Sequence, residues 1–290
     1  MKKRFSVILQ GGIGNQLFQI CSGLYYAKKH DRDLQFVLSN DEKQNVFDLL
    51  NKDEFNVLYR KESGLQVFIN RVLNRILKKS KKLRSIVMIH NSEEVGFNIS
   101  LSKNSTFKQL RGYYQTHLYF EEVKPELISA IRISNFSDWY LSQRLIISST
   151  IRPVMIHIRR GDYDQQSKSF GLLSIDYYKN AINYLRELNF TGPIWIFSDD
   201  TVIAATFAQL LDEVTHVVNP PRGTSACESM ALMWEFSAHI IANSTFSWWG
   251  AILSSKSQIV IAPDPWFRNG LQIKNLIPPS WVKLNAYWED

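Results

Sequence analysis

Short apolar segments alternate with helix-like segments through the second half of the chain, and this pattern constrains the fold more than any other feature. The predicted strands are 154–158, 194–197, 214–218, 239–242 and 258–262. The predicted helices between them are 175–188, 201–211, 224–237 and 246–254. Strands that are apolar throughout and separated by helices are typical of a parallel sheet covered on both faces. The sequence therefore predicts a Rossmann-like α/β domain over residues 150–265.

The N-terminal half opens with a similar unit. A strand is predicted at 5–9, a glycine turn at 11–14, a helix at about 16–29 and a second strand at 34–38, whereas residues 40–110 show no regular pattern. A chain of 290 residues is about the size of two ordinary domains. We therefore expect an N-terminal domain over 1–145, with the boundary at 140–153 before Arg152-Pro153. Residues 266–290 are expected to form a tail that packs back on the N-terminal domain.

Composition excludes several protein classes. Hydrophobic residues make up 45% of the chain and charged residues 21%, which is typical of a globular protein and not of a disordered one. Two cysteines are too few for a disulfide scaffold. The apolar runs are far shorter than the ~20 residues that cross a bilayer, and the run after Lys2-Lys3-Arg4 is too short for a secretory signal. These features predict a cytoplasmic protein.

The net charge of +7 comes from one segment. Residues 71–84 contain seven basic residues and no acidic ones, which accounts for the whole surplus. A general nucleic-acid surface is therefore not supported, and no nucleic-acid partner is expected. Apolar residues from Phe68 onward recur at helical spacing beside these charges. Residues 68–84 are thus predicted to form either an ordinary solvated helix or one that rests peripherally on the anionic inner face of a membrane.

Polar residues follow the predicted strands at the points where ligands bind in open α/β sheets. Arg159, Arg160, Gly161 and Asp162 follow the strand at 154–158. Because side chains alternate along a strand, His157 and Arg159 are expected on one face and Arg160 on the other. Arg159 has the fork of donors that suits a phosphate, and Arg160 is expected to brace the site through Asp162 or another carboxylate. The alternative is a structural cluster of ion pairs.

Three further segments complete the predicted site. Ser198, Asp199 and Asp200 follow the strand at 194–197, where the carboxylates could bind guanine or ribose but spacing favours a helix cap. Ser244, Thr245, Phe246 and Ser247 start a helix after 239–242, a position that suits a phosphate and equally suits capping. Gly12 and Gly14 lie in a turn where the backbone could pass close to a ligand. Together these segments favour a nucleotide diphosphate.

A metal site is not expected. Asp162-Tyr163-Asp164 has the D-x-D spacing of manganese-dependent sugar transferases, but two arginines beside it could neutralise a diphosphate themselves. The six histidines show no metal-binding spacing. No bound cofactor or metal ion is predicted.

Five motifs occur in the order seen in one enzyme family. They are GGIGNQLFQ at 11–19, GYYQ at 112–115 with Tyr119-Phe120, HIRRGDY at 157–163, FSDD at 197–200 and NSTFSWWGA at 243–251. With these motifs the chain resembles bacterial α-1,2-fucosyltransferases of glycosyltransferase family 11. The HIRRGDY and NSTFSWWG strings are specific, whereas the glycine turn alone is not.

The resemblance implies a GT-B-like fold with two Rossmann-like domains and a cleft between them. The C-terminal domain would hold GDP-fucose, and the N-terminal domain would hold a galactose-terminated glycan in O-antigen or surface glycan synthesis. The reaction would be metal-independent and inverting, and it would place fucose on the 2-hydroxyl of a β-galactoside in α linkage.

The resemblance also implies roles for individual residues. Arg159 would hold the β-phosphate, and His157 would contact the nucleotide sugar. Asp199 and Asp200 would serve the guanosine end, and residues 244–247 the diphosphate. Asn15 and the neighbouring glycines would face the reacting sugar. Asp162 is a candidate general base, although an arginine partner would lower the pKa of its carboxyl group and weaken it as a base.

Two other functions remain open. A transferase of another nucleotide sugar would use the same site, and competition by GDP but not UDP would separate the two. A non-catalytic carbohydrate-binding protein could use the eight tryptophans and twelve tyrosines for stacking on sugars. Such a protein has no need of an arginine fork and a hydroxyl cluster suited to a diphosphate.

Overall fold

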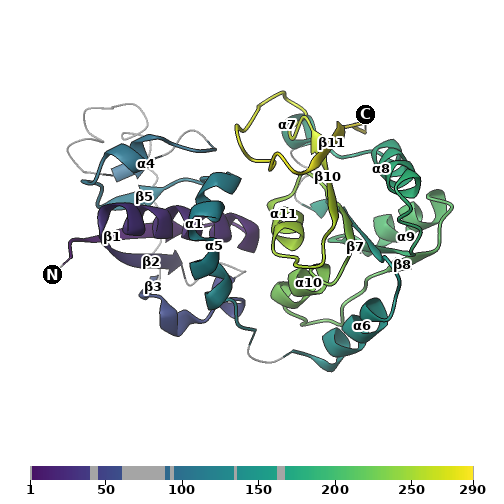
Figure 1. Ribbon diagram of the computed structural model, residues 1–290, viewed down its shortest axis with the longest axis horizontal. Helices are drawn as coiled ribbons and strands as arrows, with labels where there is room; N and C mark the ends of the chain where they lie inside the picture. The colour runs from purple at the N-terminus through teal and green to yellow at the C-terminus, as the bar shows by residue number, and fades with distance from the viewer. Residues whose placement is uncertain are drawn as a thin grey trace. The chain divides into compact units, whose positions relative to one another are not determined.

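The computed structural model describes residues 2–39, 45–60, 89–91, 95–133, 136–161 and 167–289. The chain divides into two compact units (Figure 1). Unit 1 comprises Met1–Ser134 with Ile273–Leu276, and unit 2 comprises Asn135–Gln272 with Ile277–Asp290. Each unit is built around one parallel β-sheet in the described part of the chain.

The sheet of unit 1 has five strands among the described residues, in the order β3-β2-β1-β5-β4. They are β1 (Arg4–Leu9), β2 (Asp33–Ser39), β3 (Val57–Arg60), β4 (Ile89–Asn91) and β5 (Gln109–Arg111). All of their pairings are parallel. The predicted strands at 5–9 and 34–38 are confirmed. β3, β4 and β5 were not predicted, because three or four residues are too few to show a period.

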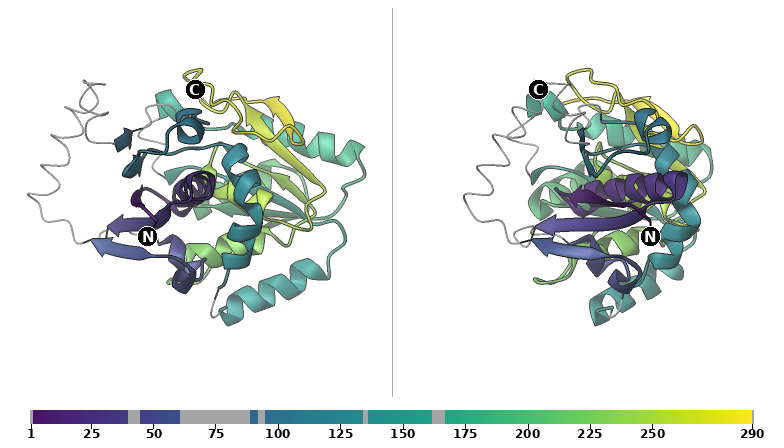
Figure 2. Two further views of the ribbon diagram at one scale, coloured as in Figure 1. Left: turned by 60° about the vertical axis from the view of Figure 1, so that its left-hand side comes forward. Right: turned by 90° about the vertical axis from the view of Figure 1, so that its left-hand side faces the viewer.

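Helix α1 (Ile13–His30) follows β1 directly and runs along the sheet in the right-hand view of Figure 2. It packs against α5 (His117–Ala130), which kinks at Val123 just before Pro125, a residue that cannot donate the helical hydrogen bond. The α1 residues Leu17, Phe18 and Ile20 are fully buried. Shorter helices complete the described part of unit 1: η1 (Val46–Asp48), η2 (Lys52–Glu54) and α4 (Ser100–Lys103).

The sheet of unit 2 has six strands in the described chain, in the order β11-β10-β9-β6-β7-β8. They are β6 (Val154–Ile158), β7 (Ile194–Ser198), β8 (Thr215–Val217), β9 (Ala238–Ile240), β10 (Ile259–Asp264) and β11 (Val282–Asn285). Every pairing is parallel, and β6 lies between β7 and β9. All five strands predicted in this half of the chain are confirmed. β11, the edge strand, was not predicted.

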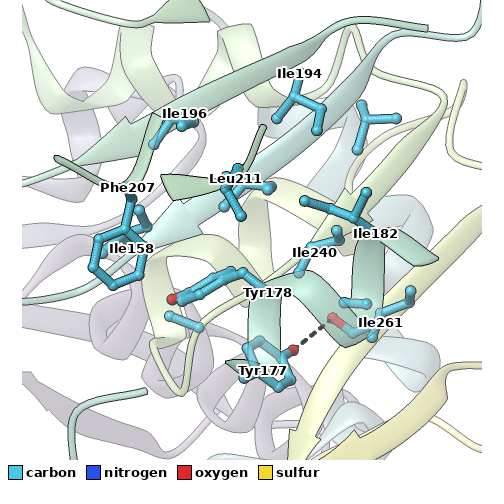
Figure 3. Packing of buried hydrophobic residues seen from close by; sticks show 14 of the residues in the cluster. Ile158, Tyr177, Tyr178, Ile182, Ile194, Ile196, Phe207, Leu211, Ile240 and Ile261 are labelled. Carbon is cyan, nitrogen blue, oxygen red and sulfur yellow. Dashed lines mark hydrogen bonds between the residues drawn. The ribbon is translucent and has the colours of Figure 1, made fainter. Parts of the chain in front are cut away.

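Helices cover both faces of this sheet (Figure 1). On one face, α8 (Ile175–Glu187) and α9 (Thr201–Leu210) pack on alternate strand residues such as Ile158 and Ile196 (Figure 3). On the other face lie α10 (Ala226–Met233) and α11 (Thr245–Ile252), where the Met233 carbonyl accepts a hydrogen bond from His239 Nε2 at 2.8 Å. Because helices cover both faces of the sheet, residues on both sides of its central strands are buried, and these strands are mainly apolar in sequence.

Unit 2 begins earlier than the sequence suggested. The expected boundary was 140–153, but α6 (Asp138–Ser148) belongs to unit 2. Two carboxylates hold it there: the Ser137 hydroxyl donates to Glu228 (2.6 Å), and Arg144 pairs with Glu235 (3.0 Å). The C-terminal segment also differs from the separate tail that was expected, because residues 277–290 belong to unit 2, where β11 extends the sheet beside β10.

Candidate active site

Three polar segments meet at the carboxyl edge of the unit 2 sheet. Residues 159–161 follow β6, residues 199–200 follow β7 and residues 243–247 follow β9. β6 pairs with both neighbours, through His157 opposite Phe197 on one side and Ile156 opposite Ile240 on the other. The sheet order therefore brings together segments that lie up to about 90 residues apart in sequence, at the place where α/β sheets bind ligands.

Arg159 is held by a carboxylate from the neighbouring strand. Its Nη1 lies 2.8 Å from Asp199 Oδ2, and the two side chains are 28% and 26% exposed. Asp199 Oδ1 also accepts from the Arg160 backbone amide at 2.8 Å. Gly161 adopts a φ of +37°, and a Cβ there would lie 2.4 Å from Asp199 Oδ2. The turn after β6 therefore requires glycine and fixes Arg159 in a partly solvated position.

Arg160 lies on the opposite face of the sheet, as the alternation predicted. Its guanidinium stacks over the Phe207 ring of α9 at 5.1 Å, and the side chain is only 4% exposed. It forms a bidentate pair with Glu289, and not with a residue of its own loop among those described. The sequence grouped Arg160 with the nucleotide-binding residues, but in the structure its guanidinium is engaged by a carboxylate near the end of the chain.

His157 is an uncharged imidazole at neutral pH. Burial, with a smaller effect of the Arg159 charge, lowers the pKa of His157 from its usual 6.5 to about 3. Its Nδ1 has no hydrogen-bond partner among the described residues, which is uncommon for a buried polar atom. The Phe246 ring of α11 lies 6.0 Å from the imidazole. The first turn of α11 therefore lies beside this histidine.

Some of the polar groups at the hydroxyl-rich start of α11 are used to cap the helix. Ser244 is the N-cap and accepts from the Phe246 amide at 3.3 Å, and Ser247 donates to the Ser244 carbonyl at 3.2 Å. Both serines are buried, whereas Thr245 and Phe246 are half-buried. The capping alternative is therefore confirmed for Ser244, and the half-buried Thr245 and Phe246 form the more accessible part of this turn.

The carboxylates after β7 also have structural partners. Asp200 caps α9 by accepting from the Val202 and Ile203 amides at 2.9 and 3.0 Å, as the spacing predicted. Ser198 accepts from the Asp200 amide at 3.0 Å. Both oxygens of Asp199 and the Oδ1 of Asp200 already take part in these bonds, so a contact with guanosine through them would be shared.

The glycine turn of unit 1 places Asn15 in the first turn of α1. Gly11 has a φ of +76°, Gly12 is the N-cap and Gly14 is buried. The Asn15 Oδ1 accepts from Gln115 Nε2 at 2.8 Å, which fixes the orientation of its amide. Gln115 was noted only as part of a motif, and its contact with Asn15 could not be inferred from sequence.

Several predicted features lie outside the described residues. These are Asp162, Asp164 and the basic segment 68–84, so the general base, the D-x-D motif and the membrane contact stay predictions. Among the described residues, no group of three or more His, Cys, Asp or Glu side chains could hold a metal ion. No helix in the described part of the chain has the length and apolar character needed to span a bilayer.

Sequence relatives cover almost the whole chain. An Escherichia coli alpha-1,2-colitosyltransferase is 32% identical over 95% of this chain and 97% of its own length. The E. coli O-antigen biosynthesis glycosyltransferase WbnK is 28% identical over 95% of this chain and 99% of its own length. A Caenorhabditis elegans galactoside 2-alpha-L-fucosyltransferase is 23% identical over 96% of this chain and 78% of its own length.

Solved structures share the fold. NodZ alpha-1,6-fucosyltransferase, determined with GDP-fucose, matches with a TM-score of 0.53 at 14% identity, over 91% of this chain and 96% of that one. A family 9 glycosyl transferase from Veillonella parvula matches with a TM-score of 0.52 at 12% identity, over 98% and 87%. These matches confirm the predicted GT-B-like α/β class. The sequence model of glycosyl transferase family 11 matches residues 1–285, and the chain therefore belongs to glycosyltransferase family 11.

Proposed function

We propose that this glycosyltransferase moves L-fucose from GDP-β-L-fucose to the 2-hydroxyl of a β-galactoside, with inversion to an α-1,2 linkage. Two relatives support the linkage through their names, alpha-1,2-colitosyltransferase and galactoside 2-alpha-L-fucosyltransferase. WbnK, named for O-antigen biosynthesis, supports a role in surface glycan synthesis. The family membership and the Arg159 geometry together carry the proposal.

The chemistry requires stabilisation of a leaving diphosphate. As the bond between fucose and the β-phosphate breaks, negative charge grows on GDP and positive charge grows on the sugar ring. Arg159 is oriented by Asp199 before the reaction, at the sheet edge that receives ligands. A guanidinium fixed in advance stabilises the growing charge without reorganising during the reaction. A guanidinium has five N–H donors in a fixed fork, so the same side chain can pair with Asp199 and also donate to a phosphate.

His157 and the start of α11 extend the donor site in this proposal. At neutral pH, an uncharged imidazole can donate a hydrogen bond to the nucleotide sugar or accept one from it, without any change of charge. The α11 N-terminus carries a partial positive charge that favours the diphosphate, next to Thr245 and Ser247. Asp199 and Asp200, with Ser198 beside them, would serve the guanosine end. Since Arg159 and its neighbours would neutralise the diphosphate, no metal ion is required.

The acceptor side of the reaction is assigned to unit 1. Asn15, fixed by Gln115, and the Gly12 and Gly14 backbone would face the reacting sugar. Asp162 remains a candidate general base. The alternative is that the acceptor hydroxyl loses its proton late, to phosphate or water, without a dedicated base.

A different donor sugar is the second candidate. The colitosyltransferase, at 32% identity, favours it, because colitose is fucose without the 3-hydroxyl group. Turnover of GDP-fucose compared with the GDP-linked 3-deoxy sugar separates the two candidates. A site that hydrogen-bonds the 3-hydroxyl should reject the deoxy donor strongly, since its polar groups would be left unpaired.

Calorimetric titration with GDP, with and without EDTA, tests the donor site. We expect GDP binding that survives EDTA and is lost in Arg159→Ala, and UDP is the control nucleotide. Absence of GDP binding would reject the donor assignment. Binding that EDTA abolishes would reject metal independence and point to Asp162 and Asp164.

The basic segment is proposed to hold the enzyme peripherally on the cytoplasmic face of a membrane, where lipid-linked glycans would be met. Replacing Lys78, Lys79, Lys81 and Lys82 by glutamine should weaken sedimentation with phosphatidylcholine vesicles that contain phosphatidylserine. Each lysine near such a surface contributes about 1 kcal/mol. Equal sedimentation of both proteins would reject this contact.

A further inference from the structure

The second arginine of the H-x-R-R motif depends on a residue near the end of the chain. Arg160 Nη1 and Nη2 lie 2.8 and 2.5 Å from the two carboxylate oxygens of Glu289. The other contacts of this guanidinium in the described chain are the Leu173 carbonyl at 3.3 Å and the Phe207 ring at 5.1 Å. Neither of those groups carries a negative charge, so Glu289 supplies the counter-charge for a buried cation.

The segment that carries Glu289 is itself fixed at several points. The Glu289 amide donates to the Leu172 carbonyl at 2.8 Å, and Trp288 forms an antiparallel bridge with Leu173. The Trp288 ring packs over Gly171, where a Cβ would lie 2.4 Å from the ring. Residues 287–289 leave the edge strand β11 (yellow in Figure 1) and pair with residues 172–174. These contacts therefore hold the backbone of Glu289 in place beside Arg160.

The same arginine connects this pairing to the donor site. The Arg160 amide donates to Asp199 Oδ1, and the other oxygen of that carboxylate lies 2.8 Å from Arg159 Nη1. The position of the Arg160 backbone thus affects the carboxylate that orients Arg159. Among the described residues, a guanidinium that lost Glu289 would have no other carboxylate paired with it, and it would have to move toward water or draw in water.

We propose that Glu289 is a positioning residue of the donor site: it holds Arg160 and, through it, fixes the turn at 159–161 from which Arg159 faces the leaving phosphate. This rests on the proposed function for the identity of the donor. The contacts that carry the proposal lie within unit 2 and do not depend on which nucleotide binds.

The test compares Glu289→Gln with a matched control, Glu213→Gln. Glu213 forms a bidentate pair with Arg186 at 2.7 and 3.0 Å in the same unit, before β8 at the opposite edge of the sheet. In the purified full-length chain, we would measure GDP affinity by calorimetry, the KM for lactose and amide exchange over 159–161. We expect Glu289→Gln to weaken GDP binding by about 10-fold or more, the value of one charge-assisted hydrogen bond. We also expect faster exchange at 159–161 and an unchanged KM for lactose.

The comparison with Glu213→Gln decides the role of Glu289, and the unmodified chain decides the donor. If Glu289→Gln binds GDP and exchanges at 159–161 as Glu213→Gln does, the positioning role is rejected. If the unmodified chain binds another nucleoside diphosphate and not GDP, the proposed donor is rejected, and the exchange comparison still decides the role of Glu289. Should Glu289→Gln not fold, Glu289→Asp keeps the charge on a shorter arm, and its exchange at 159–161 should be faster than that of the unmodified chain. Exchange in Glu289→Asp equal to that of the unmodified chain would also reject the role.

Discussion

Replacing Arg159 by lysine tests whether geometry as well as charge stabilises the leaving group. Arg159 uses Nη1 to pair with Asp199 at 2.8 Å. A guanidinium can make this bond and present a second nitrogen to a phosphate at the same time. A lysine ammonium is a single point charge, and Asp199 would compete with the phosphate for it. The lysine variant is therefore expected to be impaired although its charge is unchanged.

The expected magnitudes follow from the number of bonds removed. Arg159→Ala removes the donor entirely, which lowers kcat by about 10²–10³-fold, or about 2.7–4 kcal/mol of transition-state stabilisation. Arg159→Lys removes about one charge-assisted hydrogen bond, worth about 1.5–3 kcal/mol, or roughly 10- to 150-fold in rate. The pair is about a quarter exposed, so solvent screening favours the lower end of that range.

The assay is single-turnover transfer from GDP-fucose to lactose, with thermal unfolding as a check on folding. Arg186→Lys is the matched control, because Arg186 also pairs with a carboxylate at similar exposure, Glu213 at 2.7 Å, away from the site. We expect the control to transfer fucose at the normal rate. A rate for Arg159→Lys equal to that of Arg186→Lys would refute the role of the fork.

Three further predictions concern stability and the acceptor side. Because burial lowers the pKa of His157 to about 3 and that of His239 to about 4, the unfolded chain binds more protons than the folded one below pH 6.5. The free energy of unfolding should therefore fall as pH is lowered from about 6.5 toward 4, by about 1.4 kcal/mol per pH unit per histidine, and urea titrations of His239→Asn should show a shallower dependence. Gly192→Ala should lower the free energy of unfolding by about 1–3 kcal/mol, since its Cβ would lie 2.2 Å from a backbone oxygen, yet leave transfer per folded molecule unchanged. A melting temperature equal to that of the unmodified chain would contradict this. Gln115→Ala frees the Asn15 amide and should lower transfer without changing GDP affinity; weaker GDP binding would place this pair on the donor side.

Much of unit 2 was predictable from local sequence. Apart from the edge strand β8, its predicted strands are mainly apolar and buried, because helices cover both faces of the sheet. The apolar pattern therefore follows directly from the fold. Asp200 was assigned as a cap because a helix start has amides that need an acceptor within the next turn, a requirement that short-range spacing expresses. The opposite orientations of Arg159 and Arg160 followed from strand alternation alone.

Unit 1 and the domain limits were less predictable. Strands β4 and β5 are three residues long and carry no readable period. The assignment of α6 to unit 2 depends on Glu228 and Glu235, which lie about 90 residues away in sequence. Such contacts are decided by the fold as a whole, and no local pattern encodes them.

By itself, the sequence determined that the chain has two α/β regions and that an arginine pair follows a strand of the second. Only the tertiary structure decided how that pair is used. Arg159 is oriented by Asp199 because β6 and β7 are neighbours in the sheet, and Arg160 is held by Glu289 because β11 brings the last described residues beside it. A side chain's type and period are local properties, whereas the partner of a buried charge depends on which distant segments fold against it.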